Sequence, residues 1–137
     1  MAIAIYPGTF DPITPGRVDV AERASRLFDR LVVAVAIGRH KAPERSLDQR
    51  LALVREALAH LPNVEVEGFD GLVVDFAAAR GASVLVRGLR GARDVGDELA
   101  MVVTNRRIAA GIQTMFLAAS EDLGHVSSTV VRALARS

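Results

Sequence analysis

The sequence predicts an α/β fold, a doubly wound and Rossmann-like sheet of five parallel strands. Two observations predict this fold. Near-continuous apolar runs, typical of strands that are covered on both faces, alternate with segments of helical periodicity. Capping residues stand where those helices would begin and end. With 137 residues the chain can bury a substantial core, so we expect one domain spanning residues 1–137.

The strands are expected in the apolar or alternating runs at residues 2–6, 31–37, 64–68, 83–86 and 114–118. Because a helical pattern separates each strand from the next, the connections are crossovers and the strands should be parallel.

The helices are expected from spacing and caps. The first begins at about Pro15, and its apolar positions are Val20, Ala21, Ala24, Leu27 and Phe28. The second follows a capping box formed by Ser46 and Gln49, with an apolar stripe at Leu47, Leu51, Val54, Leu58 and Leu61. Three further helices are expected at residues 72–80, 94–110 and 127–135; Gly81 and Gly111 follow the first two of them.

Composition narrows the class of protein. Half of the residues are hydrophobic and the formal net charge is +1, a balance that requires neither nucleic acid nor an anionic membrane as a partner. The absence of cysteine excludes a disulfide framework and a thiolate metal site. The N-terminal segment is too broken by Pro and Gly for a signal peptide, and no apolar run reaches the length of a membrane span. We therefore expect a cytoplasmic protein.

The segment from Ile3 to Arg17 is the most informative part of the chain. An apolar strand runs into a tight Gly/Pro turn, and the turn leads into a helix start. Such a turn brings free backbone N–H groups and the positive end of a helix to one point, which is a binding site for phosphate.

Ligands of such sheets bind beyond the carboxyl ends of the strands, so the residues that follow each strand are candidates for the site. They are Thr9 and Arg17 after the first strand, Lys41 after the second, Arg87, Gly88, Leu89 and Arg90 after the fourth, and Ser127, Ser128 and Thr129 after the fifth. Cations, hydroxyls and helix starts all suit phosphate oxygens, and their convergence at one edge indicates a polyphosphate ligand.

Most of these residues have a simpler interpretation when taken alone. Thr9 and Asp11 could have no role other than shaping the turn. Arg17 and Lys41 could be solvated cations. Ser127 is most simply a helix N-cap, and Glu98 a partner of a helix dipole. The pair Arg87 and Arg90 directly follows a buried strand, which favours a function. The histidines at positions 40, 60 and 125 share no spacing typical of a metal site.

Several motifs resemble those of the phosphopantetheine adenylyltransferases, a bacterial family of the nucleotidyltransferase superfamily. Residues 6–16 match the family pattern YPG[ST]FDPxTxG without a break, and Arg17 stands where the family has histidine. Lys41, the RGLR motif at 87–90, Asp94 to Glu98 and Gly124 to Thr129 follow in the family's order and spacing. The match covers essentially the whole chain.

The resemblance implies adenylyl transfer from ATP to 4′-phosphopantetheine, a step of coenzyme A synthesis that yields dephospho-coenzyme A and pyrophosphate. It implies Mg²⁺ bound with ATP and no metal ligand from the protein. It also implies a homo-oligomer, a hexamer or a trimer, and coenzyme A as a further candidate ligand.

The resemblance also implies roles for single residues. Arg17 and Lys41 would be catalytic. The phosphopantetheine site would comprise Thr9, Lys41, Leu72, Val73 and Arg87. The ATP site would comprise Thr9, Phe10, Arg17, Gly88, Leu89, Arg90, Glu98, Ser127, Ser128 and Thr129.

The departures from the family pattern lie at ligand-facing and helix-packing positions. Besides Arg17, the motif DFEYE is replaced by DVGDE at 94–98, and Gly124 and His125 replace Ser and Phe. The sequence ends before the family's final helical segment. Three functions therefore stay open: a working adenylyltransferase, a degenerate or engineered relative that binds nucleotide or coenzyme A with little turnover, and an assembly subunit that keeps the scaffold.

Overall fold

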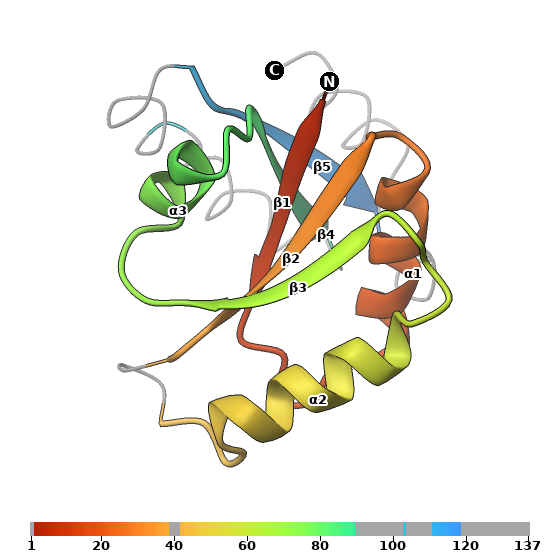
Figure 1. Cartoon of the computed structure of the whole chain (residues 1–137), viewed down its shortest axis with the longest axis vertical. Helices are drawn as coiled ribbons and strands as arrows, with labels where there is room; N and C mark the ends of the chain where they lie inside the picture. The colour runs from red at the N-terminus through yellow and green to blue at the C-terminus, as the bar shows by residue number, and fades with distance from the viewer. Residues whose placement is uncertain (1, 39–41, 90–102, 104–110, 119–137) are drawn as a thin grey trace.

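A computed structural model of the chain describes residues 2–38, 42–89, 103 and 111–118. Its centre is a five-stranded sheet in the order β3-β2-β1-β4-β5 (Figure 1). The strands are β1 (Ile3–Gly8), β2 (Arg30–Ala36), β3 (Val64–Phe69), β4 (Val84–Leu89) and β5 (Gln113–Ala118). All neighbouring strands pair in parallel. The predicted fold class and the five strands are confirmed.

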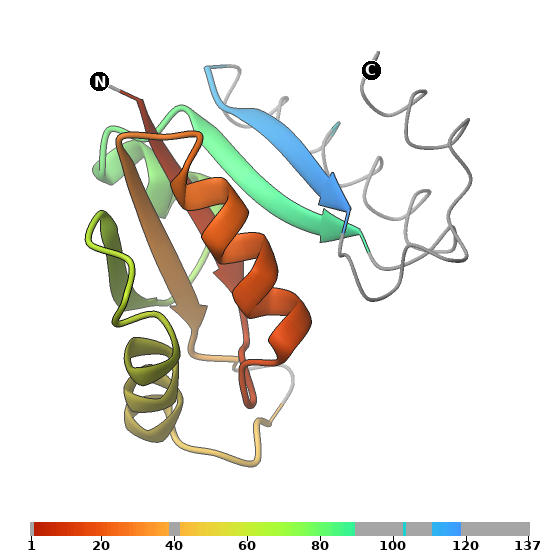
Figure 2. The ribbon, with the colours of Figure 1, turned by 90° about the vertical axis from the view of Figure 1, so that its right-hand side faces the viewer.

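Helices cover both faces of the sheet. The described residues form α1 (Pro15–Ser25), α2 (Leu47–Ala57) and α3 (Val73–Ala79). Figures 1 and 2 show α1 and α2 against one face and α3 against the other. The helices expected at 94–110 and 127–135 lie outside the described residues, except for Val103, which is helical. Among the described residues, none of the helices could cross a lipid bilayer.

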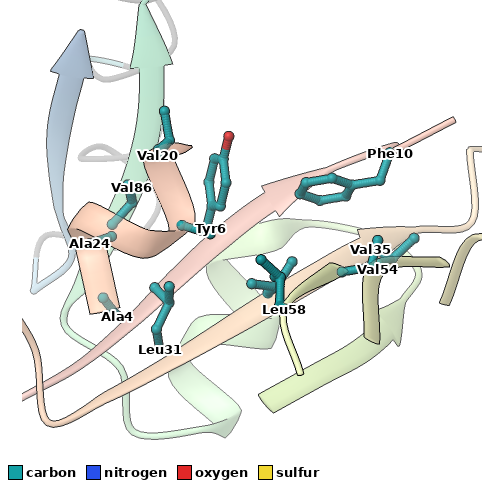
Figure 3. Packing of buried hydrophobic residues seen from close by; sticks show 12 residues of the cluster. Ala4, Tyr6, Phe10, Val20, Ala24, Leu31, Val35, Val54, Leu58 and Val86 are labelled. Atoms are coloured by element: carbon teal, nitrogen blue, oxygen red, sulfur yellow. The ribbon is translucent and has the colours of Figure 1, made fainter. Parts of the chain in front are cut away.

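The core consists of two clusters, one on each face of the sheet, because side chains alternate along the strands. Ala4 and Tyr6 of β1 point into the cluster under α1 and α2, where Val20 and Val54 join them (Figure 3). Ile5 points to the opposite face and packs in the cluster under α3. Successive side chains of a strand lie on opposite faces, so a continuous apolar run fills both layers.

The helix starts follow the capping residues predicted from the sequence. The side chain of Thr14 accepts a hydrogen bond from the backbone N–H of Arg17 at 3.3 Å, and Pro15 occupies the first helical position. At α2, Ser46 and Gln49 form the predicted capping box, with reciprocal bonds of 3.1 and 3.0 Å.

Two of the expected apolar stripes extend beyond their helices. Helix α1 ends at Ser25, and the side chain of Leu27 is 58% exposed rather than buried. Leu61 follows the end of α2 but still packs against the core. Periodicity alone does not mark a helix end, because residues in the following turn can also contact the core.

Two strands are longer than the apolar runs that predicted them. β1 continues through Pro7 to Gly8, where it still pairs with Val35 of β2. β4 continues to Leu89, which pairs with Ala118 of β5. The expectation that Arg87, Gly88 and Leu89 form a loop after the strand is therefore wrong. Pairing between backbones extends both strands past the point where the side chains stop being uniformly apolar.

The strand order reverses between β1 and β4. From β1 the chain builds outward through β2 to β3, and then returns to place β4 on the other side of β1. β1 and β4 pair only at Ala4 and Ile5. In Figure 2 the arrowheads of β4 and β5 turn away from those of β1 and β2. The sheet thus opens at its carboxyl edge between β1 and β4, which is where ligands of such sheets bind.

Candidate active site

The turn between β1 and α1 has an unusual backbone. Phe10 has a φ of 51°, in the left-handed region that side chains other than glycine rarely adopt, and the Asp11–Pro12 peptide bond is cis. Within seven residues the chain turns from the end of β1 at Gly8 to the start of α1 at Pro15. The helix start therefore lies at the open edge of the sheet, as the sequence predicted.

The side chain of Phe10 belongs to the core. It is 2% exposed, and its ring meets the ring of Tyr6 edge to face with centroids 5.6 Å apart (Figure 3). This packing anchors the turn to β1. The residue offers a ligand little surface, which qualifies its predicted role in ATP binding.

Arg17 packs back onto the turn. Its guanidinium carbon lies 5.1 Å from the centroid of the Phe10 ring, within the range of a cation–π interaction. Its Nη1 approaches Gly8 so closely that a β-carbon on Gly8 would be 2.6 Å away. The side chain is only partly exposed. Arg17 therefore packs against the turn rather than extending freely into solvent, and its charge lies at the open edge of the sheet.

Thr9 lies beside the end of β2. Its methyl carbon is 3.8 Å from the point that a β-carbon on Gly38 would occupy. Gly38 is the last described residue before the segment 39–41, which contains Lys41. The structure thus brings Thr9, Arg17 and the chain that leads to Lys41 to one edge.

Arg50 of α2 is a residue that the sequence interpretation missed. Its side chain is 2% exposed. Within the described chain it donates hydrogen bonds to four backbone carbonyls, those of Arg45 at 3.1 Å, Thr9 at 3.0 Å, Ala36 at 2.6 Å and Ile37 at 3.0 Å. Position 50 lies three residues after Leu47 and four before Val54, so helical spacing places it on the buried stripe. A charged residue in that stripe was the available signal.

Asp11 also links the β1–α1 turn to the segment before α2. Its carboxylate accepts hydrogen bonds from the backbone N–H groups of Glu44 at 2.8 Å and Arg45 at 3.2 Å. The bond from Glu44, followed by the N–H and guanidinium of Arg45, lowers the pKa of the Asp11 carboxyl from its ordinary value of 3.8. Asp11 therefore does more than shape its own turn, because it ties the β1–α1 turn to the chain entering α2.

The predicted residues of β4 fall on different sides of the sheet. Gly88 faces α1, since a β-carbon there would lie 3.4 Å from the Val20 side chain and 3.8 Å from the Tyr6 hydroxyl. Leu89 is 3% exposed, so it offers a ligand little surface, which qualifies its predicted role in ATP binding. Arg87 is partly buried, and alternation places it on the face of Leu85, the face that carries α3.

Leu72 and Val73 stand at the start of α3, on the same face of the sheet as Arg87. Leu72 is the N-cap residue and is 54% exposed, whereas Val73 packs partly against the core cluster of that face. The structure therefore separates the predicted residues. Leu72, Val73 and Arg87 lie with α3, while Arg17 and Gly88 lie with α1.

Six predicted site residues lie outside the described residues: Lys41, Arg90, Glu98, Ser127, Ser128 and Thr129. Within residues 2–38, 42–89, 103 and 111–118, His, Asp and Glu side chains form no group of three or more that could hold a metal ion. His60 instead lies near Glu22, with Nε2 and Oε1 3.4 Å apart.

Comparison with known proteins identifies the family. Residues 5–134 match the model of the cytidylyltransferase-like family. A phosphopantetheine adenylyltransferase from Acidovorax sp. (strain JS42) is 50% identical over 130 residues, which cover 95% of this chain and 79% of that protein. One from Nostoc punctiforme is 52% identical over 134 residues, covering 98% of this chain and 73% of that protein.

A solved structure supports the fold independently of close sequence similarity. The lipopolysaccharide core biosynthesis protein from Thermoplasma volcanium GSS1 superposes with a TM-score of 0.60 at 22% identity, over 88% of this chain and 97% of that one. At this identity the likeness concerns the fold alone. The identity of about half the residues to the named relatives is what decides the family: this chain belongs to the phosphopantetheine adenylyltransferases, within the cytidylyltransferase-like nucleotidyltransferases.

Proposed function

We propose that this chain, acting as one nucleotidyltransferase domain, transfers the adenylyl group of ATP to 4′-phosphopantetheine. The products are dephospho-coenzyme A and pyrophosphate. The observation that carries the proposal is the strand–turn–helix of residues 3–17, which holds Arg17 against Gly8 and Phe10 at the open edge of the sheet. Family membership supplies the substrates.

The protein itself forms no covalent bond in this reaction. A phosphate oxygen of 4′-phosphopantetheine attacks the α-phosphorus of ATP, and the bond from that phosphorus to the bridging β-phosphate oxygen breaks. Pyrophosphate leaves with the bonding electrons, and no covalent enzyme intermediate forms. Catalysis then consists of positioning and of stabilising negative charge on the transferring phosphoryl group.

The two faces of the sheet suit the two substrates. On the α1 side, Arg17 and the backbone N–H groups of the helix start would bind the ATP phosphates. On the α3 side, Arg87 would bind the phosphate of phosphopantetheine, and the exposed Leu72 with Val73 would contact its pantetheine arm. Thr9 directly follows the end of β1 and would contact the attacking phosphate. Lys41, Arg90, Glu98 and Ser127 to Thr129 complete the proposed set.

ATP would enter as its magnesium complex, with the ion carried on the triphosphate. Mg²⁺ prefers oxygen ligands, and the phosphate oxygens of ATP supply them. Magnesium is then a part of the substrate, and the chain contributes the cations that hold the phosphates.

A pyrophosphate-release assay with MgATP and 4′-phosphopantetheine tests the proposal. We expect release only when both substrates are present, and a fall in kcat of ~10²–10³ for Arg17→Ala, the scale for a lost transition-state donor. Arg26→Ala is the matched control, because Arg26 is exposed at the other end of α1. Tight nucleotide binding without release would instead favour the binding-protein alternative.

We also propose that the chain assembles as a homo-oligomer, a trimer or a hexamer. Val103, the described residue of the helix expected at 94–110, is apolar and 53% exposed. Exposed apolar surface of this kind is typical of subunit contacts. Light scattering coupled to size-exclusion chromatography should give three or six times the chain mass of 14.6 kDa. A monomer at micromolar concentration would contradict the proposal and the assembly-subunit alternative.

A further inference from the structure

We propose that Arg50 is a positioning residue for adenylyl transfer, and that its buried guanidinium holds the catalytic edge of the sheet in one geometry. The inference rests on the proposed function for its catalytic consequence. The structural observation stands independently, since one side chain joins three separate segments at the carboxyl ends of β1 and β2.

The proposed reaction requires these three segments to keep fixed positions relative to one another. The carbonyl of Thr9 belongs to the β1–α1 turn, and the carbonyls of Ala36 and Ile37 end β2. The carbonyl of Arg45 lies just before α2. Ile37 and Arg45 thus flank, in sequence, the segment that contains Lys41. Fixing these carbonyls fixes both ends of that segment relative to Thr9.

The charge and shape of arginine explain why lysine cannot replace it fully at position 50. A buried cation has lost its water and must recover hydrogen bonds from the protein. Four carbonyl oxygens replace that water, and each bond to an ionised donor is stronger than a neutral one. The planar guanidinium offers five N–H groups in a rigid fork, whereas lysine offers a single nitrogen. Lysine at position 50 could satisfy only part of this set.

Asp11 adds a second connection between the β1–α1 turn and the chain entering α2. Its carboxylate holds the N–H groups of Glu44 and Arg45, and Oδ1 lies 3.6 Å from Nη1 of Arg45. Arg50 binds the carbonyl of Arg45 while Asp11 binds its N–H, so the two side chains hold the two backbone hydrogen-bonding groups of one residue. We call Arg50 and Asp11 together the loop brace. It joins the β1–α1 turn to the chain entering α2 at two points.

The chain offers a matched control at the opposite edge of the sheet. Asn63 also joins separate segments through backbone carbonyls, donating from Nδ2 to Ser25 at 2.7 Å and Phe28 at 3.1 Å. These residues lie at the end of α1 and before β2, away from the proposed site. A purely structural brace lost there should lower the melting temperature without slowing catalysis.

The experiment compares Arg50→Lys, Asp11→Asn and Asn63→Ala in the full chain. Amide hydrogen exchange is followed by mass spectrometry on peptides covering residues 3–14, 42–49 and 60–70, and kcat and KM are measured below the melting transition. We expect Arg50→Lys to speed exchange in the first two peptides together. We expect its kcat to fall by up to about 10²-fold, the cost of an ångström-scale misplacement, with a much smaller change in the KM for ATP.

Asp11→Asn keeps Arg50 and its four hydrogen bonds in place, and it tests the same brace if Arg50→Lys does not fold. It should speed exchange in the same two peptides and lower kcat to a smaller extent, while Asn63→Ala speeds exchange only near 60–70 and keeps kcat. Unchanged exchange at 3–14 and 42–49 in the folded brace variants would overturn the brace. Faster exchange with an unchanged kcat would overturn its catalytic role. If the wild-type chain shows no turnover, the proposed function fails while the exchange result still decides the brace.

Discussion

A β-carbon on Gly8 would lie 2.6 Å from Nη1 of Arg17, well inside the contact distance of two atoms. The same β-carbon would meet the Phe10 ring at 2.9 Å. Glycine at position 8 is therefore what allows the arginine to fold back over Phe10. The charge that the proposed reaction needs is placed by a residue that has no side chain.

Gly8→Ala should consequently slow the enzyme. The added methyl group displaces the Arg17 guanidinium, so kcat should fall toward the value of Arg17→Ala. The two changes act through one interaction, and the double variant should be slower than either single one by much less than the product of their effects. Gly111→Ala is the control, since a β-carbon there meets no atom of the described residues within 4 Å. Wild-type turnover in Gly8→Ala would show that the position of Arg17 is not limiting.

Arg87→Ala should weaken the binding of 4′-phosphopantetheine more than that of ATP. Its partly buried guanidinium lies on the α3 face with Val73, and a lost charge-assisted hydrogen bond costs about 1.5–3 kcal/mol. Calorimetric titration of each substrate measures the difference. Arg30→Ala is the comparison, because Arg30 pairs with Glu65 at the start of β2, the far edge of the sheet. Equal affinities of Arg87→Ala and wild type would remove Arg87 from the site.

The hydrogen bonds of Asp11 predict a loss of stability in acid. The pKa of its carboxyl is lowered in the folded chain by the N–H of Glu44 and by Arg45. Its contribution to stability is therefore present above the ordinary, unfolded pKa of 3.8 and is lost as the pH falls through the lower folded pKa. In urea titrations, Asp11→Asn should be less stable than wild type at pH 6, and the gap should narrow toward pH 3. A constant gap would mean that the charge of Asp11 contributes nothing.

Gly81→Ala should destabilise the fold without affecting catalysis. Gly81 has a φ of 69° just after the end of α3, where its N–H bonds to the carbonyl of Ala78 at 3.1 Å. A β-carbon costs about 1–2 kcal/mol in that conformation, although open space surrounds the position. Thermal unfolding should show a lower melting temperature than wild type. Gly111→Ala, which has no positive φ to maintain, should melt close to wild type.

The sequence by itself was enough for the parallel α/β sheet and for the helix starts. Apolar runs, helical spacing and caps are local features, and each acts on the backbone within a few residues. The Ser46 and Gln49 box is an example, because both of its hydrogen bonds join residues three apart. The motif from Tyr6 to Gly16 was likewise sufficient to indicate the family.

Only the tertiary structure decided how far the strands run and what holds the catalytic edge together. β4 continues to Leu89 because β5 pairs with it there, and no local pattern records a pairing partner. Arg50 interrupts an otherwise apolar stripe in the sequence, yet it is buried because carbonyls from positions 9, 36, 37 and 45 converge on it. Taken alone, Arg17 could have been a solvated cation, and only the fold shows that it packs against Gly8 and Phe10. Each of these features depends on groups distant in sequence, whose approach is set by the packing of the sheet and helices rather than by any one segment.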